Sequence, residues 1–160
     1  IGQGDVDSRV YRIAATRPWR EWYRSDRVTV TSFWELSAVR IDTSHLTPGF
    51  MDTGDDAFHG IALAPVFRAW AGPFGDRGAM RPFIDFAIGL TVTDTRELRS
   101  GEWESVHFGT RWLFEDRLAV GLAIGDRFEI AYQRFHYSNA DFGEDNDGIN
   151  TNVVMLGYRF

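Results

Sequence analysis

Alternation of apolar and polar side chains with a period of two residues is the feature that most constrains this chain. From Ile84 to Val92 the even positions are all aliphatic or aromatic, whereas the odd positions are Asp85, Ala87, Gly89 and Thr91. Successive side chains of a β-strand point to opposite faces, so this pattern predicts a strand with one apolar face and one small or polar face.

The same alternation recurs over stretches of about nine to twelve residues, the length that a tilted membrane-spanning strand needs. Further strands are predicted at Val28 to Ala38, Trp112 to Ile124, Arg127 to Ser138 and Val153 to Phe160, with weaker ones at Arg9 to Thr16 and Phe58 to Trp70. Segments rich in Gly, Asp, Thr and Pro predict loops at Asp42 to Asp56, Gly72 to Gly78 and Asp141 to Gly148.

The strand pattern predicts an all-β fold, an eight-stranded antiparallel transmembrane β-barrel that forms a single domain over residues 1–160. Seven strands are visible in the pattern, and an unpaired edge in lipid would leave backbone groups without partners. The first strand is therefore expected to be missing from this chain or reduced to a remnant around Ile1 to Gly4.

A soluble barrel or sandwich would show the same period with its apolar face turned inward. Three features favour the membrane version: small and charged residues share one face of several strands, Trp and Tyr gather near strand ends, and the chain closes on an amphipathic strand ending in Tyr158, Arg159 and Phe160. In lipid, the apolar face would point outward.

Composition excludes several classes of site. The chain contains no cysteine, so disulfides, thiolate metal sites and a cysteine nucleophile are not available. The net charge of -6, with arginines scattered among acids, argues against nucleic acid as a partner. The segment DNDG at Asp145 to Gly148 lacks the spacing of a calcium loop, and His59 and His107 are interpreted as structural. No metal and no cofactor are predicted.

The densest group of reactive side chains lies between Phe135 and Asn150. His136 and Ser138 are two residues apart on a predicted strand, so both leave the same, apolar face. A serine hydroxyl becomes a nucleophile when a neighbouring base takes its proton, and that base needs a third group to fix its tautomer. Asn150 has the same parity on the adjoining strand and is the candidate for this third group. Asp116 is the one charged exception on the apolar face of its own strand.

The stretch HYSNA at His136 to Ala140, followed by NDGI at Asn146 to Ile149, resembles the active-site hairpin of the PagL-type lipid A 3-O-deacylases. The resemblance extends to APVF at Ala64 to Phe67, RPFIDFAIG at Arg81 to Gly89 and FEDR at Phe114 to Arg117. It implies an outer-membrane barrel that acts on lipopolysaccharide from its lipid-facing wall in the bacterial outer membrane. Assembly into a homo-oligomer is left open.

Carried over by position, the resemblance implies that Ser138 is the nucleophile, His136 the general base and Asn146 an oxyanion-hole residue. Two positions depart from the family pattern. Asn150 stands where the triad acid is expected, and Asp141 replaces a glycine whose backbone N–H helps to hold the oxyanion. An amide can orient the imidazole but cannot neutralise the imidazolium, and a non-glycine residue with positive φ is strained.

Two interpretations of these departures stay open at the level of sequence. In the first, the chain is a serine-type esterase that removes the ester-linked 3-hydroxyacyl chain at the 3-position of lipid A. Its imidazole is then oriented by Asn150 alone, at a reduced rate, or receives the missing charge from Glu144, Asp145 or Asp147. In the second, the barrel is catalytically weakened and has a structural or lattice-forming role in the outer membrane.

Overall fold

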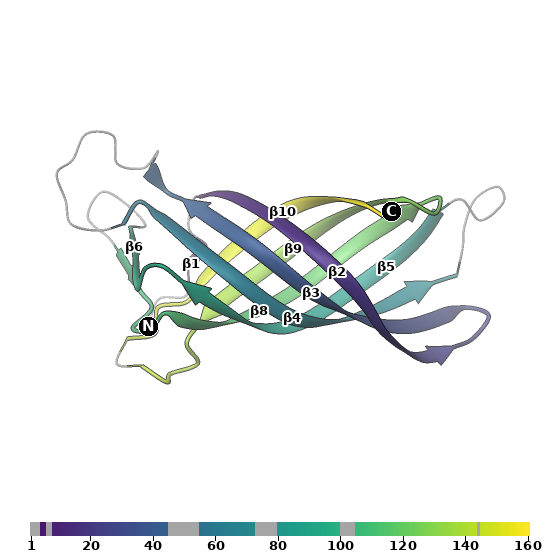
Figure 1. Cartoon of the computed structure of the whole chain (residues 1–160), viewed down its shortest axis with the longest axis horizontal. Coiled ribbons are helices and arrows are strands. Elements are labelled where there is room, and N and C mark those ends of the chain that lie inside the picture. The colour runs from purple at the N-terminus through teal and green to yellow at the C-terminus, as the bar shows by residue number, and fades with distance from the viewer. Residues whose placement is uncertain (1–3, 6–7, 45–54, 73–79, 100–104, 144) are drawn as a thin grey trace.

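The computed structural model describes residues 4–5, 8–44, 55–72, 80–99, 105–143 and 145–160 (Figure 1). Its strands are β1 (Gly4–Asp5), β2 (Arg9–Arg24), β3 (Val28–Asp42), β4 (Ala57–Ala71), β5 (Met80–Thr93), β6 (Glu97–Arg99), β7 (Ser105–His107), β8 (Trp112–Ile124), β9 (Phe128–Ser138) and β10 (Ile149–Tyr158). Among the described residues, no helix is long and apolar enough to cross a membrane. The all-β prediction is confirmed.

The main sheet has eight strands in the order β1-β10-β9-β8-β5-β4-β3-β2, and its long members pair antiparallel in a strongly tilted wall (Figure 1). The strand β1 covers two residues and pairs in parallel with the start of β10, at the place where the sequence predicts a remnant of the first strand. Its neighbours at residues 1–3 lie outside the described part. The ladder pairs β10 with β1 and leaves β2 as the other edge.

Each segment with strong alternation forms a strand. The two segments with weaker alternation form β2 and β4, which are among the longest strands. The strand β2 continues eight residues past the predicted end at Thr16, through Pro18, with register shifts between Pro18 and Arg20 and between Glu21 and Tyr23. Proline cannot donate to the ladder, so an irregularity in the pairing beside it is the expected way for the strand to continue. Most of the predicted loops Asp42 to Asp56 and Gly72 to Gly78 lie outside the described residues.

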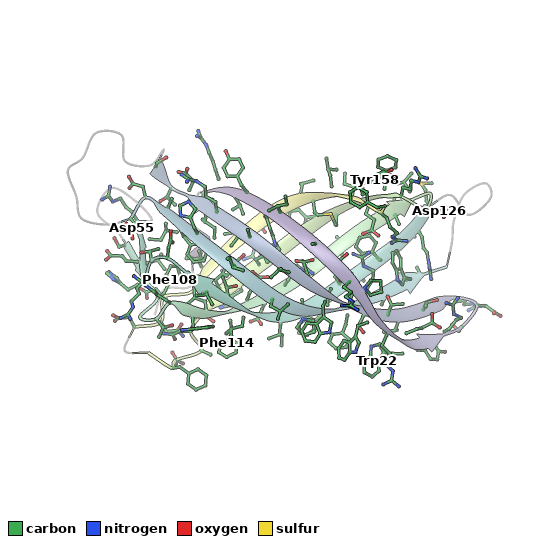
Figure 2. The ribbon with its side chains drawn as sticks, viewed as in Figure 1. Trp22, Asp55, Phe108, Phe114, Asp126 and Tyr158 are labelled. Carbon is green, nitrogen blue, oxygen red and sulfur yellow. The ribbon has the colours of Figure 1, made fainter. Side chains whose placement is uncertain are left out.

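The apolar face of the sheet points outward, and the small or polar face points inward. Leu118 is 58% exposed, Ile84 is 54% exposed and Leu156 is 80% exposed. In Figure 2, aromatic side chains including Trp22 and Tyr158 project from the outer surface of the wall. Such a surface is stable in hydrocarbon and not in water, so the soluble alternative is excluded in favour of a transmembrane wall.

Charged side chains fill the interior. Arg12 donates through Nη1 and Nη2 to the two carboxylate oxygens of Glu115 at 2.8 and 2.7 Å, and Glu35 accepts from both Arg12 and Arg117 at 3.1 and 2.7 Å. A second group joins Arg68 to Asp85 and Glu129. Ions removed from water are tolerated when each is paired and hydrogen-bonded, as here.

The connections between strands differ in length at the two ends of the wall. The described turns at one end are short, with β2 joined to β3 by residues 25–27 and β8 to β9 by residues 125–127. At the other end, longer segments join β3 to β4, β5 to β8 and β9 to β10. In outer-membrane barrels the short turns are periplasmic and the long loops extracellular.

Candidate active site

His136, Ser138 and Asn150 lie together on the outer face, near the long-loop end. His136 and Ser138 are on β9 with the same outward parity, and Asn150 of β10 is the register partner of His136. His136 Nδ1 and Asn150 Oδ1 are 3.0 Å apart, and all three side chains are half-buried. The structure therefore brings together the three residues that the sequence groups as a catalytic constellation.

The contact with Asn150 determines which imidazole nitrogen can act as a base. Because an amide oxygen only accepts, Oδ1 selects the tautomer in which His136 Nδ1 carries the hydrogen. The lone pair is then on Nε2, which is the arrangement required for taking a proton from a serine hydroxyl. Asn150 can thus orient the ring, although it adds no negative charge.

Gly148 gives the imidazole the space it occupies. A Cβ atom built on Gly148 would lie 2.7 Å from Cε1 and 3.2 Å from Nε2 of His136. Gly148 itself is buried, immediately before β10. A side chain at this position would have to displace the ring from Asn150, so the glycine is needed for the close approach of the loop to the imidazole.

Asp116 is a neighbour of His136 that the sequence singled out without assigning a role. On β8 it is the register partner of His136, on the opposite side from Asn150, and it is half-buried on the outward face. Directly paired residues of antiparallel strands have Cβ atoms about 4.5 to 5.5 Å apart. A carboxylate at this position can favour a positive charge on the ring. The sequence feature that draws attention to Asp116 is a charged residue on an otherwise apolar strand face.

The loop after β9 holds the two predicted oxyanion residues. Asn146 Oδ1 accepts the backbone N–H of Asn139 at 2.9 Å, and Asn146 Nδ2 donates to Asp141 Oδ1 at 2.9 Å. Asp141 has φ of 62° and Ala140 has φ of 52°, the left-handed backbone that the sequence predicts at Asp141. The carboxylate of Asp141 therefore competes for an amide N–H that an oxyanion would use.

Asn139 anchors this loop and was not identified from sequence. Its side chain is buried, and Nδ2 donates to the carbonyl oxygens of Phe108 at 2.7 Å and Asp145 at 2.6 Å. Asp145 is six residues further along the same loop. Phe108 is 31 residues away along the chain, so only the tertiary fold brings it to Asn139. The same contacts join the loop to the segment that follows the β6–β7 hairpin.

Of the loop acids that the structure describes, neither Asp145 nor Asp147 has a hydrogen bond or ion pair with His136. Asp147 Oδ2 accepts the backbone N–H of His107 at 3.2 Å, and Asp147 N–H donates to the His107 carbonyl oxygen at 3.0 Å. Asp147 thus lies against the β7 end of the hairpin. Asp145 is exposed. Glu144 lies outside the described residues.

The described residues contain no group of three or more His, Asp or Glu side chains arranged to hold a metal ion. His59, interpreted from sequence as a structural residue without a carboxylate partner, has one in space: its Nδ1 lies 2.7 Å from Asp94 Oδ2. Asp94 is 35 residues away along the chain. Sequence spacing could not show this pair.

The family model for lipid A 3-O-deacylase (PagL) matches residues 9–159, which include every strand of the main sheet except β1. The chain belongs to this family. Within the PagL family it is similar to the lipid A deacylase PagL of Pseudomonas aeruginosa, with 25% identity over 155 residues that cover 94% of this chain and 78% of that protein.

The lipid A deacylase PagL of Bordetella bronchiseptica is 28% identical over 96 residues, which cover 60% of this chain and 46% of that protein. The crystal structure of the outer membrane enzyme PagL superimposes with a TM-score of 0.77 at 23% identity and covers 96% of this chain and 91% of that one. The fold of the PagL barrel is therefore shared along nearly the whole chain.

Proposed function

We propose that this chain is an outer-membrane esterase that removes the ester-linked 3-hydroxyacyl chain at the 3-position of lipid A. The observation that carries the proposal is the contact of 3.0 Å between His136 Nδ1 and Asn150 Oδ1, with Ser138 on the same outward face of β9. Membership of the lipid A 3-O-deacylase family and the similarity to PagL of Pseudomonas aeruginosa support lipid A as the substrate.

The position of the site fits a substrate that arrives from within the membrane. His136 and Ser138 lie on the apolar outer wall near the end with long loops, which in this class of barrel faces the cell exterior. Polar groups on a lipid-facing surface are costly and are therefore a sign of function. Lipopolysaccharide in the outer leaflet can reach these residues by lateral diffusion.

In the first half of the reaction, Ser138 Oγ attacks the carbonyl carbon of the ester while His136 Nε2 takes its proton. The carbonyl oxygen becomes an oxyanion, and Asn146 Nδ2 and the backbone N–H of Asp141 are its candidate donors. The bond to the sugar oxygen then breaks. The proton on His136 passes to that oxygen, so the products are the sugar alcohol and an acyl ester of Ser138.

In the second half, water attacks the acyl group and gives its proton to His136. Collapse of the second tetrahedral intermediate releases a 3-hydroxy fatty acid and returns the proton to Ser138 Oγ. Asn150 keeps the imidazole oriented in both halves. Asp116, which pairs with His136 across β8 and β9, is the described carboxylate best placed to favour the transient imidazolium.

A second candidate is a catalytically weakened barrel with a structural role in the outer membrane. It is favoured by one contact, the hydrogen bond of 2.9 Å from Asn146 Nδ2 to Asp141 Oδ1. This bond places a carboxylate beside the proposed oxyanion donor, where negative charge opposes the transition state. The two candidates make opposite predictions for lipid A in cells that express the protein.

Mass spectrometry of lipid A from cells expressing the wild type or Ser138→Ala separates them. The enzyme should remove the mass of one 3-hydroxyacyl chain in the wild type, and Ser138→Ala should abolish the loss because no nucleophile remains. Ser37→Ala is a matched control, since Ser37 Oγ is buried without a hydrogen-bond partner among the described residues. Identical spectra for all three, with each protein folded in the outer membrane, would establish the weakened barrel.

A further inference from the structure

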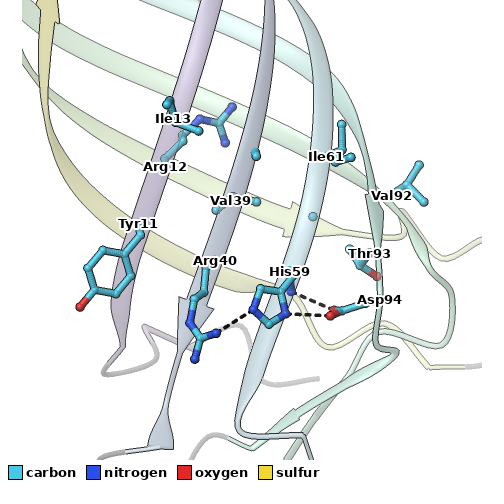
Figure 3. A pocket seen from close by; sticks show the side chains of 12 residues that line it. Tyr11, Arg12, Ile13, Val39, Arg40, His59, Ile61, Val92, Thr93 and Asp94 are labelled. Atoms are coloured by element: carbon cyan, nitrogen blue, oxygen red, sulfur yellow. Dashed lines mark hydrogen bonds and ion pairs between the residues drawn. The ribbon is translucent and has the colours of Figure 1, made fainter.

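A shallow apolar groove of about 720 Å³ lies on the outer wall across β2, β3, β4 and β5 (Figure 3). Its membrane-side row consists of four outward side chains that are register neighbours: Ile13, Ala38, Ile61 and Val92. Ala38 is the smallest of them and lies in the middle, so it forms the floor. The width of one small residue between branched neighbours suits a single hydrocarbon chain.

A polar row closes the groove towards the long-loop end. Tyr11, Arg40 and His59 are register neighbours one step beyond the apolar row, and Asp94 follows beside His59 (Figure 3). Arg40 Nη1 and His59 Nε2 are 2.8 Å apart, and His59 Nδ1 is 2.7 Å from Asp94 Oδ2. Both ring nitrogens of His59 are therefore engaged, and the ring bridges Arg40 and Asp94.

Asp94 in this row and Asp42 next to it each accept hydrogen bonds from neighbouring groups. Asp94 accepts the backbone N–H of His59 at 2.9 Å through Oδ1 and the ring through Oδ2. Burial by itself would raise the pKa of Asp94, but these hydrogen bonds outweigh it and lower the pKa. Asp42 accepts from Arg40 Nε and Nη2 through Oδ2, and from the N–H and hydroxyl of Ser44 through Oδ1.

Arg40 has donors left over. Three of its five N–H groups are directed to Asp42 and His59, which leaves two without a partner among the described residues. Its side chain is 46% exposed beside the apolar row. A guanidinium that is held in place by its neighbours and has two N–H groups to spare can donate to a pair of phosphate oxygens.

We propose that this groove is a second lipid-binding site, which takes a phosphorylated outer-leaflet glycolipid of the lipid A class with one acyl chain over Ala38 and a phosphate on Arg40. The groove lies at the long-loop end, as the proposed catalytic residues do, but on another part of the wall: β8 separates β9 from β5, which is the strand of the groove nearest to them. The inference uses the outer-membrane location given above and does not depend on Ser138 being a nucleophile.

Native mass spectrometry of the full chain tests the proposal with purified bisphosphorylated lipid A as the probe. Ser138→Ala serves as the background, because it prevents turnover and leaves both surfaces in place. Two successive lipid adducts are expected. Arg40→Ala should weaken one adduct by on the order of tenfold or more, the effect of losing charge-assisted hydrogen bonds. Ala38→Phe, which fills the floor, should remove the same adduct.

Arg27→Ala is the control, since Arg27 is exposed in the β2–β3 turn at the opposite end. A single adduct that Arg40→Ala removes would support lipid binding in the groove and count against lipid binding at the wall beside Ser138. The inference is overturned if every adduct binds equally well in Arg40→Ala and Ala38→Phe. It is also overturned if lipid A stripped of its phosphates binds the groove as tightly as the intact lipid.

Discussion

Replacing Asn150 by Asp is the most direct test of how His136 is supported. The two side chains have the same shape, so a carboxylate oxygen can take the place of Oδ1, which lies 3.0 Å from His136 Nδ1. Both the amide oxygen and a carboxylate oxygen accept from Nδ1–H, so the tautomer that Asn150 selects is kept. The change therefore adds one negative charge.

The size of the effect follows from the geometry. Two unit charges about 4 Å apart attract by about 1 kcal/mol in water and by about 4 kcal/mol at an effective dielectric constant near 20. Because His136 and Asn150 are half-buried, we expect an intermediate value of about 2 kcal/mol, or about thirtyfold in kcat/KM. In the proposed mechanism the ring gains its positive charge when it takes the proton of Ser138, so most of this attraction acts in the transition state.

The measurement is kcat/KM for lipid A deacylation in detergent by the purified wild type and Asn150→Asp. Asn152→Asp is the matched control: it adds the same charge to the same outward face of β10, where Asn152 Oδ1 accepts from Tyr132 and not from His136. It should change kcat/KM little. Measuring kcat/KM for Asn150 and Asn150→Asp again in an Asp116→Asn background shows how much the Asp116 carboxylate of β8 already contributes.

An unchanged kcat/KM for Asn150→Asp in both backgrounds, with the barrel folded, would refute the reasoning. The missing charge would then not limit the reaction, and the competition between Asp141 and an oxyanion for Asn146 would be the defect to examine next. A decrease would show that the amide N–H of Asn150 has a role that a carboxylate cannot perform.

Two further predictions concern packing and stability. Gly148→Ala should lower kcat by on the order of 100-fold in an enzyme assay without unfolding the barrel, because its Cβ would lie 2.7 Å from Cε1 of the His136 ring. Gly157→Ala, at the other end of β10, should leave kcat unchanged, and equal effects of the two substitutions would contradict the close approach of Gly148 to His136. Glu115→Gln should lower the free energy of unfolding by about 3 kcal/mol, measured by denaturant titration in detergent. The substitution removes the carboxylate that accepts two hydrogen bonds from the buried Arg12 guanidinium. An unchanged free energy of unfolding would mean that Glu35 alone can balance the charge of Arg12.

The sequence determined the fold class because strand alternation is a local property. Whether a side chain faces lipid or lumen depends on its parity, so the apolar faces of β5 and β8 were readable without any long-range information. The same rule placed His136 and Ser138 together. It was least informative for β2, where Pro18 interrupts the pattern and the pairing with β3 is irregular, so the predicted strand was too short.

The tertiary structure decided which groups face each other across strands. Asn150 was expected near His136 from parity, but only the register of β9 with β10 makes the two residues direct partners. The register of β8 with β9 likewise gives Asp116 a place beside the base, and the pairing of His59 with Asp94 depends on neighbouring strands whose residues are far apart in the chain.

The sequence by itself thus determined a membrane-type β wall and the side chains that could perform ester hydrolysis on it, because both depend on residue type and on a period of two. The tertiary structure alone decided that the Asp147 carboxylate bonds to His107, that Asp141 takes an N–H of Asn146, and that Asn139 holds the loop. The Asp147–His107 and Asn139–Phe108 contacts join residues 40 and 31 positions apart, so they depend on how separate loops pack at one end of the barrel. The Asn146–Asp141 contact depends on the conformation of the loop between β9 and β10. No local sequence pattern encodes either.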